Sequence, residues 1–124
     1  MGREGFKELK VWEMAKDLAV DIYRLTAQGP LNRDYGLREQ IQRSAVSIAS
    51  NIAEGDERET DKESVRFFYI AKGSLAEFRT QMQIAYEIGY LAKDVYEKID
   101  SKCIELGKMV GKLIKSRQGE SVPK

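Results

Sequence analysis

The sequence predicts an all-α protein, an antiparallel up-down-up-down four-helix bundle. Apolar residues recur at helical spacing over almost all of Lys7 to Arg117, and no segment alternates as a strand would. The connections between helical segments are a few residues long, which places consecutive helices side by side and antiparallel. With 124 residues, of which 33% are charged and 42% hydrophobic, residues 1–124 are expected to form one domain.

The first two helices are expected near residues 7–28 and 36–54. Gly29-Pro30 ends the first, because glycine suits a helix C-terminus and proline disfavours a helical residue before it. A polar loop from Leu31 to Gly36 follows, and Gly55 is the expected end of the second helix. Their buried stripes are expected to be Val11, Ala15, Leu18, Ile22 and Leu25, then Leu37, Ile41, Ala45, Ile48 and Ile52.

The third helix is expected near residues 60–88, because Thr60 and Glu63 have the spacing of a capping box. Gly73 in its middle costs about 1 kcal/mol relative to alanine, which predicts a close approach by a neighbouring backbone. The helix ends at Gly89-Tyr90. Its expected buried stripe is Phe67, Ala71, Leu75, Phe78, Met82 and Ala85.

The fourth helix is expected near residues 94–117, with Asp94 as a candidate N-terminal cap and a frayed tail over 118–124. Its expected buried stripe is Val95, Ile99, Cys103, Leu106, Val110 and Leu113.

Composition excludes much catalytic chemistry. The chain has no His, so it lacks His-based nucleophile pairs and His-ligated metal or haem sites. Cys103 is the lone cysteine, which fits a reducing compartment. We expect a cytoplasmic protein without a cofactor, because the sequence has no membrane-length apolar run, signal peptide, P-loop or dinucleotide fingerprint.

The acidic part of the chain is residues 51–63, which carry six acids and two bases. Acids at the end of one helix and the start of the next are often merely solvated or favoured by the helix dipole. The carboxylates of Glu54, Asp56, Glu57 and Glu59 lack the glycine and ligand spacing of a calcium loop, so no metal is expected. An enzyme that uses Glu54 and Glu77 for acid–base chemistry is a third-rank alternative.

A polar stripe lies on the second helix. Its side chains either form a functional site or make a network with the third helix that fixes how the two helices pack, and the second interpretation is favoured. The stripe is Arg43, Ser47, Asn51 and Glu54, ending at Gly55, and its expected counterpart is Gly73, Ser74 and Glu77.

Basic residues gather near the C-terminus, where residues 108–124 carry five bases and one acid. Lys108, Lys112 and Lys115 share a sector opposite the apolar stripe, and with Arg117 they are the first candidates for nucleic-acid phosphate contacts. The alternative is that these lysines only oppose the negative end of the helix dipole. Second-rank candidates are Arg33, Arg38 and Arg43.

The third and fourth helical segments carry more aromatic residues than the inner stripe of a helix can bury. Aromatic residues left at the surface suggest self-association. Core packing is the alternative for Phe67 and Trp12. The residues concerned are Phe67, Phe68, Tyr69, Tyr86, Tyr90 and Tyr96.

Several spaced motifs resemble the bacterial 23S rRNA intervening-sequence protein family, also described as a four helix bundle protein family. The resemblance extends over Phe6 to Ser116. The motifs are Phe6-x-x-Leu9-x-Val11-Trp12-x-x-Ala15, Gln40-x-x-Arg43-Ser44-x-x-Ser47-Ile48-x-x-Asn51-Ile52-Ala53-Glu54-Gly55, Phe67-x-x-x-Ala71-x-Gly73-Ser74-x-x-Glu77 and Gly89-Tyr90.

The resemblance implies a left-handed bundle that assembles into a ring-shaped homopentamer. A related branch is the accessory variability protein of diversity-generating retroelements, whose pentamer looks like a basic nucleic-acid-binding partner for a reverse transcriptase. The present chain departs from that branch, because its net charge is only +1. The expected function is a non-enzymatic homo-oligomeric scaffold that binds RNA or DNA through basic residues. The alternative is a protein–protein adaptor without a nucleic-acid role, which presents its acidic 54–63 corner or exposed aromatics to another protein.

Overall fold

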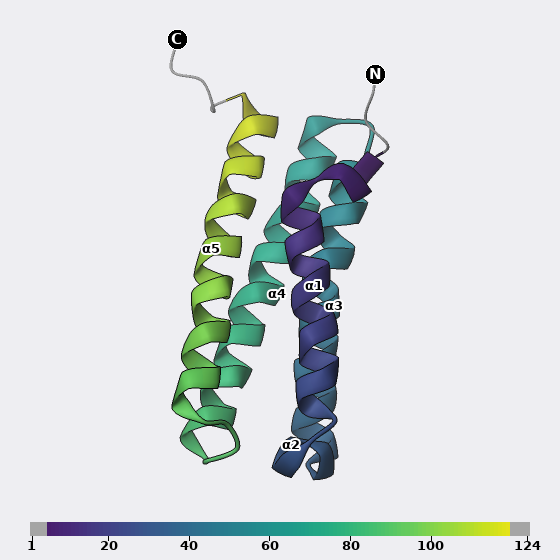
Figure 1. The fold of residues 1–124 in the computed structure, drawn as a ribbon. Coiled ribbons are helices and arrows are strands. Elements are labelled where there is room, and N and C mark those ends of the chain that lie inside the picture. The colour runs from purple at the N-terminus through teal and green to yellow at the C-terminus, as the bar shows by residue number, and fades with distance from the viewer. Residues whose placement is uncertain (1–4, 120–124) are drawn as a thin grey trace.

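The computed structural model describes residues 5–119, and within that range every regular element is helical. A short 3-10 helix, η1 (Gly5–Glu8), precedes α1 (Lys10–Thr26) and α2 (Gly29–Arg33). The longer helices α3 (Tyr35–Asp56), α4 (Asp61–Glu87) and α5 (Lys93–Gln118) follow. Figure 1 shows α1, α3, α4 and α5 running alternately up and down, so the predicted antiparallel four-helix bundle is confirmed.

One core is shared by the four long helices. Helix α3 packs most extensively against α4, α1 packs on α3, and α5 packs on α4, whereas the fourth interface between neighbouring long helices, α1 with α5, is the smallest of the four. Helical periodicity identified most of the buried side chains. The apolar stripe of each helix is buried by packing against the other helices, so the residues that share a stripe also share the core. The buried apolar residues include Val11, Ala15, Leu18 and Ile22 of α1, Ile41, Ala45, Ile48 and Ile52 of α3, Ala71, Leu75, Phe78 and Met82 of α4, and Cys103, Leu106, Val110 and Ile114 of α5.

The start of the chain differs from the prediction. Helix α1 begins at Lys10 rather than near residue 7, after the separate η1 turn. The expected polar loop after Pro30 is wrong, because residues up to Arg33 form the short helix α2. Proline fits the first turn of a helix, where its missing N–H is not needed. The turn is held down by Leu31, whose side chain is 1% exposed.

Gly55 does not end the second long helix as predicted, since α3 continues through it to Asp56. Gly55 is buried, and a methyl group there would lie 2.5 Å from Cε1 of Phe68. Its missing side chain therefore makes room for the Phe68 ring, which is fully buried. The prediction of Phe67 as the core residue is also wrong, because Phe67 is half-buried beneath the Arg58 guanidinium, 4.4 Å from its ring centroid.

The ends of α4 and α5 show which local sequence signals correctly predicted a helix boundary. Thr60 caps α4 as predicted, because its side-chain oxygen accepts a hydrogen bond from the Glu63 N–H at 3.2 Å. The predicted Asp94 cap is wrong: α5 begins at Lys93, and its N-cap, Ala92, has no side-chain hydrogen bond. Gly119, with φ of 78°, ends α5. Of the predicted tail over 118–124, Gln118 instead belongs to α5, and residues 120–124 lie outside the described residues.

The prediction for Gly73 is also wrong. It is exposed, and apart from its chain neighbours and the backbone of its own helix, no described atom lies within 4 Å of where a Cβ would stand. In the fourth stripe, Ile114 is buried, whereas Leu113 is half-buried against the core. Over residues 5–119 no helix combines the length and apolar character needed to cross a membrane.

Candidate nucleic-acid interface

Three exposed lysines lie on the outer side of α5. Lys108, Lys112 and Lys115 are four and three residues apart, so they share one helical sector, and each is exposed. They face away from the stripe that contains Leu106 and Val110, which is buried in the core. The ordinary packing of an amphipathic helix therefore presents these three charges to solvent.

Helix α4 adds a basic and an aromatic residue beside this sector. Contacts fix the register of the two helices: Gly107 lies against Leu75, and the Arg117 guanidinium lies 5.4 Å from the Phe68 ring centroid. Lys72 and Tyr69 lie between these two levels on α4; Lys72 is exposed and Tyr69 is 52% exposed. Sequence reasoning missed Lys72 and considered Tyr69 only for self-association, because their position beside α5 depends on the α4–α5 register.

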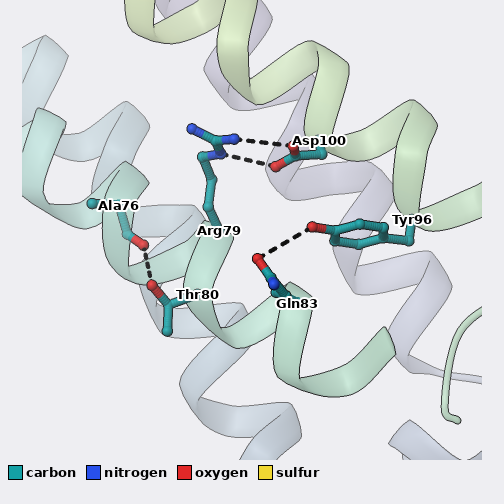
Figure 2. A network of polar contacts seen from close by, with 6 residues as sticks. All are labelled: Ala76, Arg79, Thr80, Gln83, Tyr96 and Asp100. Carbon is teal, nitrogen blue, oxygen red and sulfur yellow. Dashed lines mark hydrogen bonds and ion pairs between the residues drawn. The ribbon is translucent and has the colours of Figure 1, made fainter. Parts of the chain in front are cut away.

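Hydrogen bonds nearer the start of α5 fix the same α4–α5 register. Arg79 of α4 donates from Nε and Nη2 to the two carboxylate oxygens of Asp100 of α5, at 2.8 and 3.0 Å (Figure 2). The Tyr96 hydroxyl donates to Gln83 Oε1 at 3.5 Å (Figure 2). The Tyr96 ring stacks on that of Tyr86, with centroids 4.7 Å apart. Bidentate pairing of this kind fixes direction as well as distance, so α5 presents its lysines at a defined angle to α4.

Lys72, Lys108, Lys112 and Lys115, together with Tyr69, are called the basic face below. No acid interrupts it along either helix, because the segments 69–75 and 108–119 contain no Asp or Glu. Below it, the sector carries Glu105, Glu97 and Asp94. The field of the basic face is therefore local and positive, although the chain as a whole has a net charge of +1.

Arg117 does not join the basic face. Its Nη2 donates to Asp56 Oδ1 at 2.6 Å, and its Nη1 donates to Ser64 Oγ at 3.3 Å. The Arg117 side chain is 22% exposed and that of Asp56 is 1% exposed. Arg117, which was predicted to contact phosphates, therefore belongs to a largely buried ion pair that ties the end of α5 to α3 and α4.

The second-rank arginines lie elsewhere. Arg33 and Arg38 are at the α2–α3 end of the bundle, which is opposite the end of α5 (Figure 1). Arg38 donates to the carbonyl and side-chain oxygens of Asn32 at 2.8 and 3.0 Å, and it covers the Tyr35 ring. Arg43 is exposed on α3. The structure thus brings none of the three beside the α5 lysines.

The polar stripe of α3 forms a packing network with α4. Ser47 Oγ lies 2.8 Å from Ser74 Oγ, and Asn51 Nδ2 donates to Ser47 Oγ at 2.9 Å. Ser44, which donates to Gln81 Oε1 at 2.7 Å, extends the network and was missed by sequence reasoning. Gln81 follows Ser74 by seven residues, a helical spacing that places both on one side of α4.

Other members of the predicted stripe remain outside this network. Glu54 accepts a hydrogen bond from Arg58 at 2.6 Å, while Arg43 and Glu77 are exposed. Glu54 and Glu77 lie in opposite directions from the Ser47–Ser74 contact, roughly 15 Å apart along the bundle axis. The structure therefore does not pair these carboxylates for acid–base chemistry.

One further group that could react, the Cys103 thiol, is held within the fold. The Cys103 thiol is buried, and burial raises its pKa to about 12, so it stays protonated near neutral pH. Among residues 5–119, no three acidic or cysteine side chains gather as a metal site would require. The basic face is thus the described surface whose chemistry most clearly suits a ligand, one that carries phosphates.

Comparison with known proteins agrees with the motif resemblance. Residues 7–112 match the family model described as 23S rRNA-intervening sequence protein. A crystal structure from Bacteroides thetaiotaomicron, described as a protein with unknown function from the S23 ribosomal protein family, has the same fold, with a TM-score of 0.77 and 23% identity. The alignment covers 85% of this chain and 98% of that one. No curated protein matches the chain.

Proposed function

The chain belongs to the 23S rRNA-intervening sequence protein family, and from that premise we propose that it is a non-enzymatic, homo-oligomeric scaffold in the cytoplasm that binds RNA or DNA through its basic face. The observation that carries the proposal is the uninterrupted basic face on α4 and α5. Lysines contact phosphates without reading sequence, and an exposed tyrosine adds a surface on which an unpaired base can stack. The ligand class is therefore a structured nucleic acid with accessible phosphates.

Self-association would make weak phosphate contacts cooperate. One basic face provides four lysines, whereas a homopentamer repeats them five times around a ring, and linked contacts raise the overall affinity without any new contact. We propose the ring for this chain on the family resemblance. Light scattering tests it, because five copies give a mass five times 14.1 kDa.

An exposed apolar groove between α1 and α3 supports self-association. It encloses about 660 Å³, and its lining includes Trp12, Val20, Tyr23 and Val46. The last three are between 40% and 49% exposed. Exposed apolar patches on charged proteins are often contact surfaces, and a second copy of this chain is the partner we propose.

Many of the aromatics first considered for self-association have partners within the chain. Tyr86 stacks on Tyr96, the Tyr90 hydroxyl donates to Asp34 Oδ2 at 3.0 Å, and Phe68 is in the core. Tyr69 is the member of that set that remains largely exposed, and it belongs to the basic face. A Tyr23→Lys variant should therefore lower the oligomer mass, while Tyr69→Ser should leave it unchanged.

The decisive experiment compares two triple variants with equal charge change. Lys108→Gln, Lys112→Gln and Lys115→Gln together should weaken binding of a labelled RNA hairpin about tenfold or more at low salt. Lys7→Gln, Lys93→Gln and Lys98→Gln form the control, because all three lysines are exposed away from the basic face. Equal loss in both variants, or binding by the parent protein that is indifferent to salt, would overturn the proposal.

The alternative is a protein–protein adaptor without a nucleic-acid role. The α1–α3 groove is compatible with it, because an apolar groove can receive another protein as well as a second copy. The acidic corner at 54–63 is a second candidate surface, with Glu57 and Glu59 exposed beside the turn into α4. A specific protein that remains bound after nuclease treatment, with no RNA or DNA bound at low salt, would favour the adaptor.

A further inference from the structure

A second groove runs along the seam between α1 and α5 and encloses about 460 Å³. Its apolar lining is formed by Met14 and Leu18 of α1 and by Leu106 and Met109 of α5. Both methionines are half-buried. Methionine is flexible and polarisable, so a surface that contains it adapts to side chains of different shapes.

The seam is loosely closed compared with the other side of α5. Helices α1 and α5 are the first and last of the bundle and have no direct connection. Lys102 Nζ and Asp21 Oδ2 form an ion pair across it at 3.7 Å. By contrast, the Arg79–Asp100 pair joins α4 and α5 through two bonds of 2.8 and 3.0 Å. A partner that binds at the α1–α5 seam would therefore disrupt few polar contacts between the two helices.

Acidic residues dominate the rims of the groove. Its lining includes Glu13, Asp17, Asp21 and Glu105, against two lysines, Lys10 and Lys102. Asp17 is ion-paired with Lys16 and Asp21 with Lys102, which leaves Glu13 and Glu105 as the acids that would meet a partner. Glu13 and Glu105 are exposed on opposite rims, one on each helix. The local charge is negative, which disfavours phosphates here and favours a partner that carries positive charge.

From this combination we propose that the α1–α5 groove binds a basic amphipathic helix of a partner protein. An apolar stripe of that helix would lie over Met14 and Met109, while its flanking Lys or Arg side chains would meet Glu13 and Glu105. This is the helix-in-groove mode of recognition, in which shape gives contact area and charge gives orientation. The site is distinct from the basic face, because its lining contains none of the residues of the basic face and its rim acids carry the opposite charge.

A second copy of the chain is a poorer match for the groove. The exposed lysines at 108, 112 and 115 lie on a helix already packed in its own bundle. Beside them the sector offers Ile104, which is 44% exposed, and Gly111 rather than a continuous apolar stripe. Charge would attract such a surface, but the methionines would remain uncovered.

The test uses two synthetic probes of about 14 residues, roughly 21 Å long as helices. One has leucine on one face and lysine on the other, and the second has glutamate in place of lysine. Fluorescence anisotropy of labelled peptide should show binding of the lysine probe and none of the glutamate probe. The double variant Glu13→Gln with Glu105→Gln should lower the affinity for the lysine probe about tenfold. Met109→Lys should abolish binding of that probe.

The control is Glu39→Gln with Glu97→Gln, which removes two exposed acids outside the groove and should leave peptide affinity unchanged. RNA binding should not weaken in the Glu13/Glu105 variant, because the change removes acids and leaves every lysine of the basic face in place, and this separates the proposal from the basic face. Equal peptide binding by all variants would overturn the groove assignment. A fall in the mass of the oligomer in the Glu13/Glu105 variant would also overturn it, because the occupant would then be a second copy.

Discussion

Gly55 of α3 and Phe68 of α4 occupy neighbouring space so closely that a methyl group on Gly55 would stand 2.5 Å from the ring. The same methyl would lie 3.0 Å from the Ser64 carbonyl oxygen. The Phe68 ring is fully buried, so moving it would displace the side chains packed around it. The absence of a side chain at this position is therefore part of how α3 and α4 fit together.

Gly55→Ala should lower the free energy of unfolding by about 1 to 3 kcal/mol, because the added methyl overpacks a closed site. Urea titration followed by circular dichroism measures this change. Gly73→Ala is the matched control, since position 73 is exposed on a helix with no neighbour nearby. It should raise the free energy of unfolding by about 0.5 to 1 kcal/mol. Similar effects from the two substitutions would contradict the packing argument.

Arg117→Gln should lower the free energy of unfolding by about 1.5 to 3 kcal/mol, because the nearly inaccessible Asp56 carboxylate loses one charged hydrogen-bond partner, 2.6 Å away. Thermal and urea unfolding provide the measurement. Lys115→Gln, two residues earlier and exposed, should change stability by less than about 0.5 kcal/mol. If Arg117→Gln proves neutral while reducing RNA affinity, Arg117 acts in binding and our structural assignment is wrong.

Cys103 should make stability fall in alkali. In the unfolded chain a thiol loses its proton near pH 9.0, whereas burial raises the folded-state pKa of Cys103 to about 12. Between these values the folded chain holds more protons, so this thiol lowers the free energy of unfolding by up to about 1.4 kcal/mol per pH unit as pH rises. Relative to Cys103→Ala, the parent protein should lose stability between about pH 8 and about pH 10. Parallel pH profiles for the two proteins would refute the assignment.

Lys72→Gln should reduce the salt dependence of duplex DNA binding. If Lys72 contacts one phosphate, the slope of log affinity against log salt should become shallower by about 0.9. Lys93→Gln, exposed at the far end of the α4–α5 pair, serves as the control and should leave the slope unchanged. An unchanged slope in Lys72→Gln would restrict the basic face to α5.

Features that depend on neighbours in sequence could be predicted. Helical period identified four long helices, and Thr60 was identified as a cap because its partner lies three residues away. Period alone could not choose between Phe67 and Phe68, because they precede the buried Ala71 by four and three residues and both spacings are helical. The choice depends on the space left by Gly55, a residue of another helix.

The candidate site was predicted in part for the same reason. The sector of Lys108, Lys112 and Lys115 follows from spacing within one helix. Two other features depend on how the helices are aligned against one another. They are the ion pair of Arg117 with Asp56 and the position of Lys72 beside the lysines of α5. Within the polar stripe, Ser47 and Ser74 could be matched by their motifs. Ser44 and Gln81 could not, because glutamine in an amphipathic helix usually indicates a solvated position.

The order in which the helices pack bears on how the chain folds. Each extensive interface joins helices adjacent in the sequence, apart from the short α2 turn, so the ordered state can grow by closing short loops at small entropic cost. Such low contact order is typical of folding in microseconds to milliseconds. The α1–α5 seam joins the two most distant parts of the described chain. We therefore expect it to close last during folding and to open first during native-state hydrogen exchange.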